Sequence, residues 1–210
     1  MDLVGFLASR WQAILQLTAE HLVIVVTAMA ISVILGVVIG IAITFNRAAA
    51  RIVLKFANLM MTIPSLALFA LLIPVLGLGK ASAIVGLVAY TQLPLIRTVY
   101  AGIMTIDSTI IVAARGMGLS DRTILFKIKV PLALPAVMAG IRTAAVMGIG
   151  IGAIAGYIGA GGLGVFIFQG INRTSDGMVL TGAIILSLIA ILTDQVLGQV
   201  LGRVQRRFDP

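Results

Sequence analysis

Long apolar runs separated by short polar breaks dominate this chain of 210 residues. Five runs reach the roughly 18–20 residues that a helix needs to cross the hydrocarbon core of a bilayer. They lie at about 21–45, 56–75, 83–103, 132–158 and 178–201. Pro64 and Pro74 fall inside the second run and are expected to kink it, and Pro94 is expected to break the third. The pattern predicts an all-α integral membrane protein with five transmembrane helices.

Two of the predicted spans carry small side chains at every fourth position. Such a stripe follows one face of a helix and lets two helix backbones approach closely in lipid. We expect the second striped helix above all to pack against others at the centre of the protein. The stripes consist of Ala28, Ser32, Gly36, Gly40 and Thr44 in the first span, and of Gly140, Ala144, Gly148, Gly152 and Gly156 in the fourth.

The chain divides into three predicted parts. Residues 1–19 are loosely amphipathic with Trp11 as an aromatic anchor, which indicates a segment at the membrane interface. They do not have the form of a signal peptide, because Asp2 stands where a basic start is expected and no clear cleavage site follows. Residues 20–201 form the transmembrane domain, and residues 202–210 form a basic tail.

Composition agrees with this class and removes several others. Hydrophobic residues make up 60% of the chain and charged residues 10%, against about 25% charged residues in soluble domains. Cysteine is absent and His21 is the single histidine, which excludes disulfides, thiolate chemistry and a histidine metal cluster. An intramembrane serine protease would depend on that one imidazole, near the outer boundary of the first span. We expect no catalytic residue, no metal and no cofactor.

The net charge of +8 is explained by topology better than by nucleic acid. Lys and Arg gather in the cytoplasmic loops of membrane proteins, and five spans place the termini on opposite sides. With the N-terminus outside and the C-terminus inside, the outer side keeps only Arg10, Lys80 and Arg173. The cytoplasmic groups are then Arg47, Arg51 and Lys55 in a short basic loop that starts at Asn46, and Arg97, Arg115, Arg122, Lys127, Lys129, Arg203, Arg206 and Arg207.

The densest charge lies between the third and fourth spans, in residues 107–131, called the polar segment below. Its sequence predicts two short helices joined by a glycine turn on the cytoplasmic side. The boundary residues are Ser108 as the first cap, Gly116 or Gly118 as the left-handed end, Ser120 as the second cap, Asp121 in the second helix's first turn, and Pro131 as its end or its turn into the next span.

The first of these short helices carries more apolar surface than a bare loop in water would. Two interpretations remain open from the pattern alone: these groups contact a partner protein, or they pack beneath the protein's own spans. The residues concerned are Ile110, Ile111, Ala113, Ala114 and Met117.

A glycine-rich motif follows the fourth span. Residues 159–164 read GAGGLG and fit the letters G-x-G-x-x-G, but a membrane helix precedes them where a dinucleotide site needs a strand. We expect a turn that leads into a short re-entrant or interfacial segment at 165–171.

The polar segment resembles the EAA loop of bacterial ATP-binding-cassette importer permeases, which reads E-A-A, three residues, G, nine residues, I-x-L-P. The spacing is the same in this chain, with two departures: Val112 stands where Glu is usual, and Val130 where Leu is usual. The first departure removes any salt bridge that the glutamate would make. The matching residues are Ala113, Ala114, Gly118, Ile128 and Pro131.

Further segments are similar to permeases of the osmoprotectant branch, which imports quaternary amines such as glycine betaine, choline and carnitine. Methionine-importer permeases share the GMG and GAGGLG features, so a methionine or other small amino-acid-like substrate is the alternative. A secondary transporter without ATP would need ion-coupling acids or an internal repeat, and neither is evident. The similar segments are TIPSLALFALLIPVLGLG (62–79), LPLIRTVYAGI (93–103), LPAVMAGIRTA (134–144) and IGAGGLG (158–164).

The resemblance implies a type I importer permease of the bacterial cytoplasmic membrane. It implies pairing with a second permease, identical or a sister chain, and delivery of substrate by an extracytoplasmic binding protein. Cytoplasmic ATP-binding subunits would dock on the polar segment and hydrolyse ATP, since this chain has no phosphate loop. The coupling residues would be Ala113, Ala114, Gly118, Ile128 and Pro131.

Four further residues are candidates for roles inside the membrane. Aromatic faces attract quaternary ammonium groups, so Tyr90 and Tyr157 could line the substrate pathway, with packing or interfacial anchoring as the alternative. Asp194 is the one acid well inside a span, and intramembrane charges are functional candidates. Arg142 could pair with Asp194 or extend to the interface. The sequence leaves these choices open.

Overall fold

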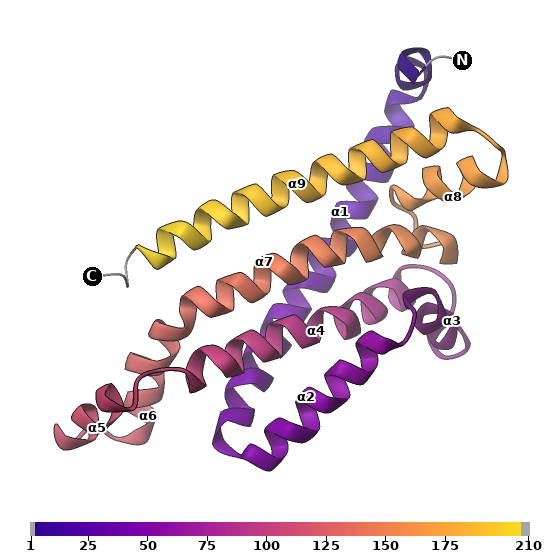
Figure 1. The fold of residues 1–210 in the computed structure, drawn as a ribbon. Coiled ribbons are helices and arrows are strands. Elements are labelled where there is room, and N and C mark those ends of the chain that lie inside the picture. Colours follow the sequence, from indigo (N-terminus) through magenta and orange to yellow (C-terminus); the bar gives the residue numbers. More distant parts are fainter. Residues whose placement is uncertain (1–2, 207–210) are drawn as a thin grey trace.

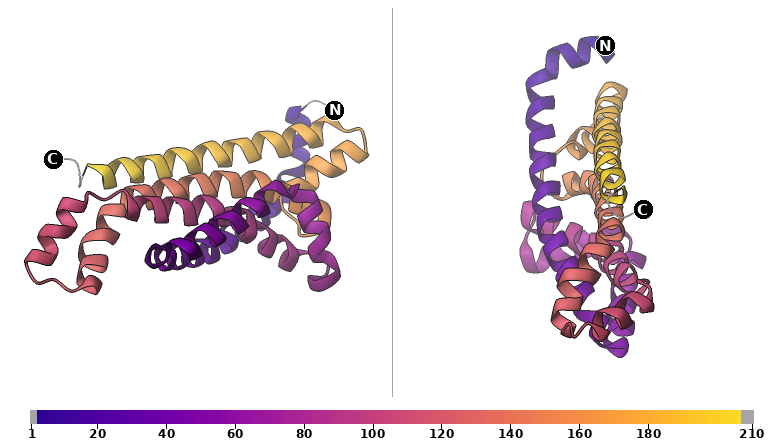
Figure 2. Two further views of the ribbon diagram at one scale, coloured as in Figure 1. Left: turned by 60° about the horizontal axis from the view of Figure 1, so that its bottom comes forward. Right: turned by 90° about the vertical axis from the view of Figure 1, so that its left-hand side faces the viewer.

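The computed structural model describes residues 3–206, and the regular structure in that part of the chain is helical. The long helices α4 (Lys80–Met104), α7 (Val130–Ile154) and α9 (Asp176–Gln205) lie side by side in that order (Figure 1). Helix α1 (Leu3–Ala42) crosses this layer and contacts all three (Figure 2). The predicted all-α membrane fold is confirmed.

Within residues 3–206, four helical stretches are long and apolar enough to cross a membrane. A fifth is formed only if α2 (Arg47–Thr62) and α3 (Ser65–Leu76) count as one broken span, because they meet at 101°. Pro64, which has no backbone N–H and disfavours a helical residue before it, stands at the break. The four stretches are Ala8–Phe45, Lys80–Met104, Asp121–Ile158 and Asp176–Gln205.

Helix α2 replaces the predicted basic loop after the first span, so that prediction is wrong. The Asn46 side chain accepts hydrogen bonds from the N–H groups of Ala48 at 2.9 Å and Ala49 at 3.1 Å, which starts a helix at Arg47. Three cations spaced four residues apart are exposed on α2: Arg47, Arg51 and Lys55. Ala50 and Ala57 are buried on the other side of the helix.

The predicted break at Pro94 is also wrong, because α4 continues through it. A proline within a helix removes one hydrogen bond, and close packing on both sides can hold the helix together. Helix α4 has α1, α2 and α7 against it. The Thr98 hydroxyl adds a hydrogen bond to the Pro94 carbonyl at 2.8 Å.

Both small-residue stripes pack as predicted. A side-chain carbon added at Gly36 would lie 2.6 Å from Leu95, and one added at Gly140 would collide with Thr98, so α1 and α7 both approach α4 closely. Between α1 and α4, the hydroxyls of Ser32 and Thr91 share a buried hydrogen bond of 2.7 Å. The glycines are therefore required by close contact between helices.

The polar segment and the glycine-rich turn lie at opposite ends of the bundle. The polar segment projects beside the C-terminal end of α9, whereas α3 and α8 (Gly164–Asn172) lie at the far end (Figures 1 and 2). Gly159, Gly161 and Gly162 all have positive φ, at 77°, 87° and 81°, and form the turn before α8. The predicted turn is confirmed, and the segment predicted at 165–171 lies within the short helix α8.

The predicted N-terminal segment and the start of the predicted basic tail are continuous with the long helices next to them. Helix α1 begins at Leu3 and runs without a break through the N-terminal segment, with Trp11 56% exposed. Helix α9 runs to Gln205 and includes Arg203 from the predicted basic tail. Residues 207–210 of that tail, and residues 1 and 2, lie outside the described residues.

Candidate functional site

Asp107 opens the polar segment by capping α5 (Ser108–Gly116). Its carboxylate accepts a hydrogen bond from the Thr109 N–H at 2.8 Å. The prediction that Ser108 is the cap is wrong, because a carboxylate one residue earlier already satisfies this N–H and suits the positive end of the helix. The backbone N–H of Thr109, and then its side chain, hold the pKa of Asp107 below its ordinary value.

Gly118, one of the two glycines predicted for this role, makes the turn between the two short helices. Its φ is +79°, in the left-handed region that glycine adopts without strain. Its N–H donates to the Arg115 carbonyl at 2.9 Å. The Arg115 and Asp121 side chains form an exposed ion pair of 2.9 Å from one side of the turn to the other. The turn therefore requires glycine for its backbone conformation, and the exposed ion pair adds a weak stabilisation.

The second short helix, α6 (Asp121–Ile124), begins with the predicted cap. The Ser120 hydroxyl accepts a hydrogen bond from the Thr123 N–H at 3.3 Å. Asp121 lies in the first turn, where the helix dipole favours a negative charge.

A π-helical turn, η2 (Leu125–Lys129), connects α6 to α7. The Val130 N–H bonds to the Leu125 carbonyl, five residues back, and Pro131 at the start of α7 has no N–H to give. The chain consequently passes from the polar segment into the central helix without leaving a helical conformation. Pro131 turns the second short helix into the next span and does not stop it.

The surface of the polar segment carries large apolar side chains among its charged and polar ones. Exposed side chains stand beside buried ones: Ala114, Ile124 and Leu125 are buried within the chain. Val112, at the position where the EAA pattern has glutamate, is 69% exposed. The other large exposed apolar side chains are Ile110, Met117 and Phe126.

The five predicted coupling residues lie in the stretch from α5 to the start of α7, and their exposure differs. Ala113 and Gly118 are exposed, Ala114 is buried, and Ile128 and Pro131 are half-buried. The two interpretations of the apolar groups therefore divide between residues: Ala114 packs inside this chain, whereas Ile110 and Met117 face outward.

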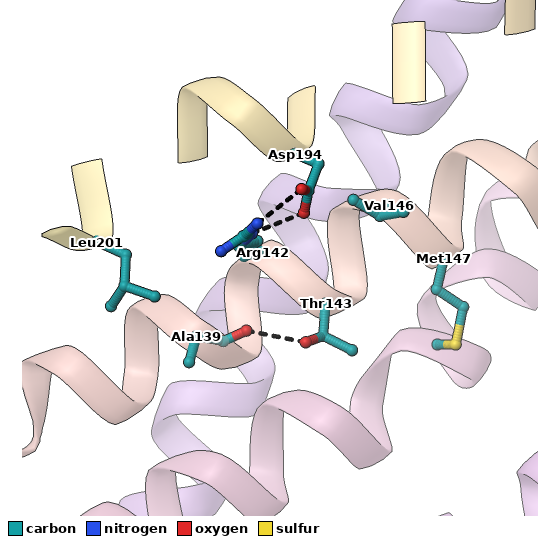
Figure 3. A pocket seen from close by; sticks show the side chains of 7 residues that line it. All are labelled: Ala139, Arg142, Thr143, Val146, Met147, Asp194 and Leu201. Atoms are coloured by element: carbon teal, nitrogen blue, oxygen red, sulfur yellow. Dashed lines mark hydrogen bonds and ion pairs between the residues drawn. The ribbon is translucent and has the colours of Figure 1, made fainter. Parts of the chain in front are cut away.

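Arg142 on α7 and Asp194 on α9 form a two-point ion pair (Figure 3). The Arg142 Nε and one terminal nitrogen each donate to a different Asp194 oxygen, both at 2.6 Å. The pair lines a cavity of about 520 Å³ together with Thr143, Met147 and Leu201. Its side chains remain 37% and 42% exposed, although both helices are long enough to cross the membrane.

The structure does not bring Tyr90 and Tyr157 together. Tyr90 is 5% exposed and donates its hydroxyl to the Ile63 carbonyl, at the break between α2 and α3. That carbonyl lies next to Pro64, where the helical hydrogen bonds are interrupted. Tyr90 thus has a structural role at the break, whereas Tyr157 is 60% exposed.

Tyr157 lines a cavity of about 390 Å³, called the Glu20 pocket below. Its ring and that of Phe168 are 5.2 Å apart in an edge-to-face arrangement. The pocket's polar side chains are those of Glu20, Gln169 and Asn172. Sequence reasoning missed Glu20 and Phe168, because Glu20 stands 137 positions before Tyr157 and 148 before Phe168 in the sequence.

Glu20 and His21 hold the glycine-rich turn against α1. Glu20 accepts a hydrogen bond from the Gly162 N–H at 3.1 Å, 142 residues further along the chain. A side-chain carbon added at Gly161 would collide with Glu20, and one at Gly162 would lie 3.1 Å from His21 Nδ1. Gly161 and Gly162 are therefore needed for a close approach to α1, which supports the rejection of a nucleotide site.

Several packed membrane-length helices, an ion pair between two of them and a helical hairpin at one end define a multi-pass membrane protein. The chain belongs to the family described as "Binding-protein-dependent transport system inner membrane component", which matches residues 32–206. It is accordingly an integral protein of the bacterial cytoplasmic membrane and a permease subunit of an ABC importer. ATP hydrolysis takes place on a separate ATPase subunit.

Two curated relatives cover nearly the whole chain. The glycine betaine/carnitine/choline transport system permease protein OpuCB of Bacillus subtilis is 37% identical over 197 residues, which cover 94% of this chain and 91% of the relative. The osmoprotectant import permease protein OsmW of Salmonella typhimurium is 37% identical over 205 residues, covering 95% and 92%.

The fold is similar to that of a chain in the inward-facing MetNI methionine ABC transporter. The TM-score is 0.83 with 23% identity, over 91% of this chain and 95% of that chain. At this identity the likeness supports the fold, and the predicted type I importer permease fold is confirmed.

Proposed function

We propose that this permease imports quaternary-amine osmoprotectants such as glycine betaine, choline or carnitine. The observation that carries the proposal is the 37% identity to one permease named for glycine betaine, carnitine and choline and to another named for osmoprotectants, over more than nine-tenths of each chain. The likeness to the methionine transporter is a likeness of fold at 23% identity and does not favour methionine over these substrates.

The polar segment faces the cytoplasm in this proposal and docks on an ATPase subunit, with the N-terminus outside and the C-terminus inside. The exposed apolar side chains of Ile110, Val112 and Met117 support a docking role, because such a surface is unfavourable in water. Val112 provides no carboxylate, so the contact depends on apolar burial and on the shape set by Gly118.

Motion at the docking surface reaches the membrane through a continuous helical path. ATP binding closes the ATPase pair and moves α5 and α6, and the π-helical turn η2 joins α6 directly to α7. Helix α7 lies at the centre of the bundle and contacts α1, α4 and α9. A shift of the polar segment therefore moves the central helix, which switches the pathway between inward-facing and outward-facing states.

A second permease, identical or a sister chain, covers the face that carries Arg142 and Asp194. An ion pair more than one-third exposed is unfavourable against lipid, and intramembrane charges usually face protein or water. A binding protein delivers the substrate at the opposite end from the polar segment, where α3 and α8 lie. The translocation pathway runs between the two permeases, and the 60% exposure of Tyr157, against 5% for Tyr90, supports Tyr157 as the tyrosine that lines it.

Two experiments test this function. The detergent-solubilised chain should retain its ATPase on an affinity column, and triple replacement of Ile110, Val112 and Met117 by Ser should release it. Cells that lack other uptake systems should accumulate labelled choline or glycine betaine only when the chain is present with its partners. Accumulation of methionine and of neither amine would contradict the proposed substrate.

A further inference from the structure

The Glu20 pocket combines a carboxylate with two aromatic rings at the end of the bundle away from the polar segment. Glu20 comes from α1, Tyr157 from the 3-10 turn η3 (Ala155–Ile158) and Phe168 from α8. The two neighbouring elements η3 and α8 therefore meet the distant helix α1 in a cavity of about 390 Å³, within the roughly 300–1,000 Å³ of small-molecule pockets.

Two hydrogen bonds hold the Glu20 carboxylate in place without pairing its negative charge with a cation. One oxygen accepts from the Gly162 N–H at 3.1 Å and the other from the Gln16 side-chain amide at 3.0 Å. Both bonds are to neutral donors, and Glu20 forms no ion pair with any residue from Leu3 to Arg206. A carboxylate has about four acceptor positions, so Glu20 keeps capacity to face a cation in the pocket.

The aromatic rings provide the second half of a cation site. Tyr157 and Phe168 are 5.2 Å apart, with their planes at 61°. Two rings in this arrangement present different faces and edges to the same space, and an aromatic face attracts a cation within about 6 Å of its centre. A quaternary ammonium group suits such a site, because it carries charge without an N–H donor that would need an acceptor.

Two amide side chains complete the lining. Gln169 and Asn172 lie at the C-terminal half of α8 and border the same cavity. Their N–H groups can donate to the hydroxyl or carboxylate at the other end of a small quaternary amine. The pocket thus offers separate groups for the two ends of such a molecule.

We infer that the Glu20 pocket is a low-affinity binding site for the quaternary ammonium group of the substrate, with Glu20 as the charge partner and Tyr157 and Phe168 as the aromatic contacts. The inference rests on the proposed function for the identity of the substrate. The site receives the substrate on its way from the binding protein into the pathway. Because Glu20 also accepts a hydrogen bond from the glycine-rich turn, a substrate bound to Glu20 acts directly on that turn.

Glu20→Gln separates the two roles of this residue. Glutamine keeps the size and an oxygen that accepts from the Gly162 N–H, but it removes the negative charge. The probe is labelled choline, bound to the purified complex of the permease with its ATPase and without the binding protein. Glu20→Gln should weaken binding by at least about tenfold while the melting temperature stays that of the wild type.

The aromatic contacts have a matched control on another helix. Tyr157→Leu should weaken choline binding by about three- to thirtyfold, and Tyr157→Phe should keep the affinity. Phe56 on α2 is 61% exposed, close to the 60% of Tyr157, and lies away from the pocket. Phe56→Leu should therefore leave binding unchanged.

Competition identifies the chemistry that is recognised. Tetramethylammonium should displace labelled choline, whereas 3,3-dimethylbutan-1-ol, the neutral carbon analogue of choline, should not. Equal competition by the two compounds, wild-type affinity in Glu20→Gln, or the absence of choline binding to the wild-type complex would each overturn the inference. Uptake of choline or glycine betaine by the wild-type transporter in such a case would leave the proposed function intact, while failure of uptake would reject that function separately.

Discussion

Arg142 and Asp194 join the central helix α7 to the last helix α9 through two parallel hydrogen-bonded contacts, each of 2.6 Å. The guanidinium donates to both oxygens of the carboxylate, and this two-point arrangement is among the strong forms of ion pair in proteins. Gly198, one turn after Asp194, lies against the guanidinium, because a side-chain carbon added there would be 3.1 Å from it. The pair is thus fitted between the two helices.

Removal of one partner should destabilise the assembled permease, because the other charge would remain inside the membrane without a counter-ion. We expect Asp194→Ala to reduce the amount of folded transporter in the membrane several-fold. Fluorescence-detected size exclusion of the solubilised complex measures this amount. The exchanged pair, Arg142→Asp with Asp194→Arg, should recover part of the loss, and recovery no better than that of either single variant would contradict a direct pairing.

Gly118→Ala should impair coupling through backbone conformation alone. A side-chain carbon at Gly118 meets no atom within 4 Å, but its φ of +79° is unfavourable for other residues, at a cost of about 1–2 kcal/mol. Gly116 also has free space around it and lacks a positive φ, so Gly116→Ala is the matched control. ATPase retained on the solubilised permease and substrate uptake should fall in Gly118→Ala, and further in Gly118→Val, but not in Gly116→Ala.

This prediction separates a requirement for the turn from a requirement for small size. Normal uptake by Gly118→Val, inserted at the wild-type level, would show that the left-handed turn is not needed for coupling. Loss of uptake in both alanine variants would indicate instead that bulk near the docking surface is the cause.

The cap at Asp107 should depend on pH in a defined direction. Its pKa in the folded protein lies below the ordinary value of 3.8. The stabilisation is therefore complete above that ordinary value and is lost as the pH falls through the lower folded pKa. At neutral pH we expect Asp107→Ala to lower the hydrogen-exchange protection of the first turn of α5 several-fold, whereas Asp107→Asn should keep most of it. An Asp107→Ala protein with wild-type protection would show that the cap contributes nothing.

The glycine-rich turn offers a comparison between two positions of similar conformation. Gly159 and Gly161 both have positive φ, at 77° and 87°. An added side-chain carbon at Gly159 meets nothing within 4 Å, whereas one at Gly161 collides with Glu20. Gly161→Ala should therefore displace Glu20 from Gly162 and reduce transport strongly, while Gly159→Ala has only the conformational cost of about 1–2 kcal/mol. Equal uptake by the two variants would mean that contact with Glu20 is unimportant.

Local patterns in the sequence were sufficient for much of the fold. The small-residue stripes predicted close packing of α1 and α7, and Gly36 and Gly140 do lie against α4. Gly118 and Ser120 were identified correctly because glycine turns and serine caps depend on neighbouring residues only. The prediction of Ser108 as the cap is wrong because Asp107, one residue earlier, is also a good cap.

Contacts between distant segments could not be obtained in this way. Arg142 and Asp194 were recognised as possible partners, but 52 residues separate them and only the packing of α7 on α9 brings them together. The Glu20 pocket needs α1, η3 and α8 in place before its members become neighbours. The predicted basic loop after the first span is wrong because the Asn46 cap and the alanines that follow it favour a helix despite the basic composition.

The most direct test of the account is transport by the complete system. The permease, its ATPase and its binding protein, reconstituted in liposomes with ATP available to the ATPase, should accumulate labelled glycine betaine or choline, and Gly118→Val should abolish that accumulation. Accumulation that continues in Gly118→Val, or wild-type vesicles that take up neither amine, would contradict the account of an osmoprotectant permease coupled through the polar segment.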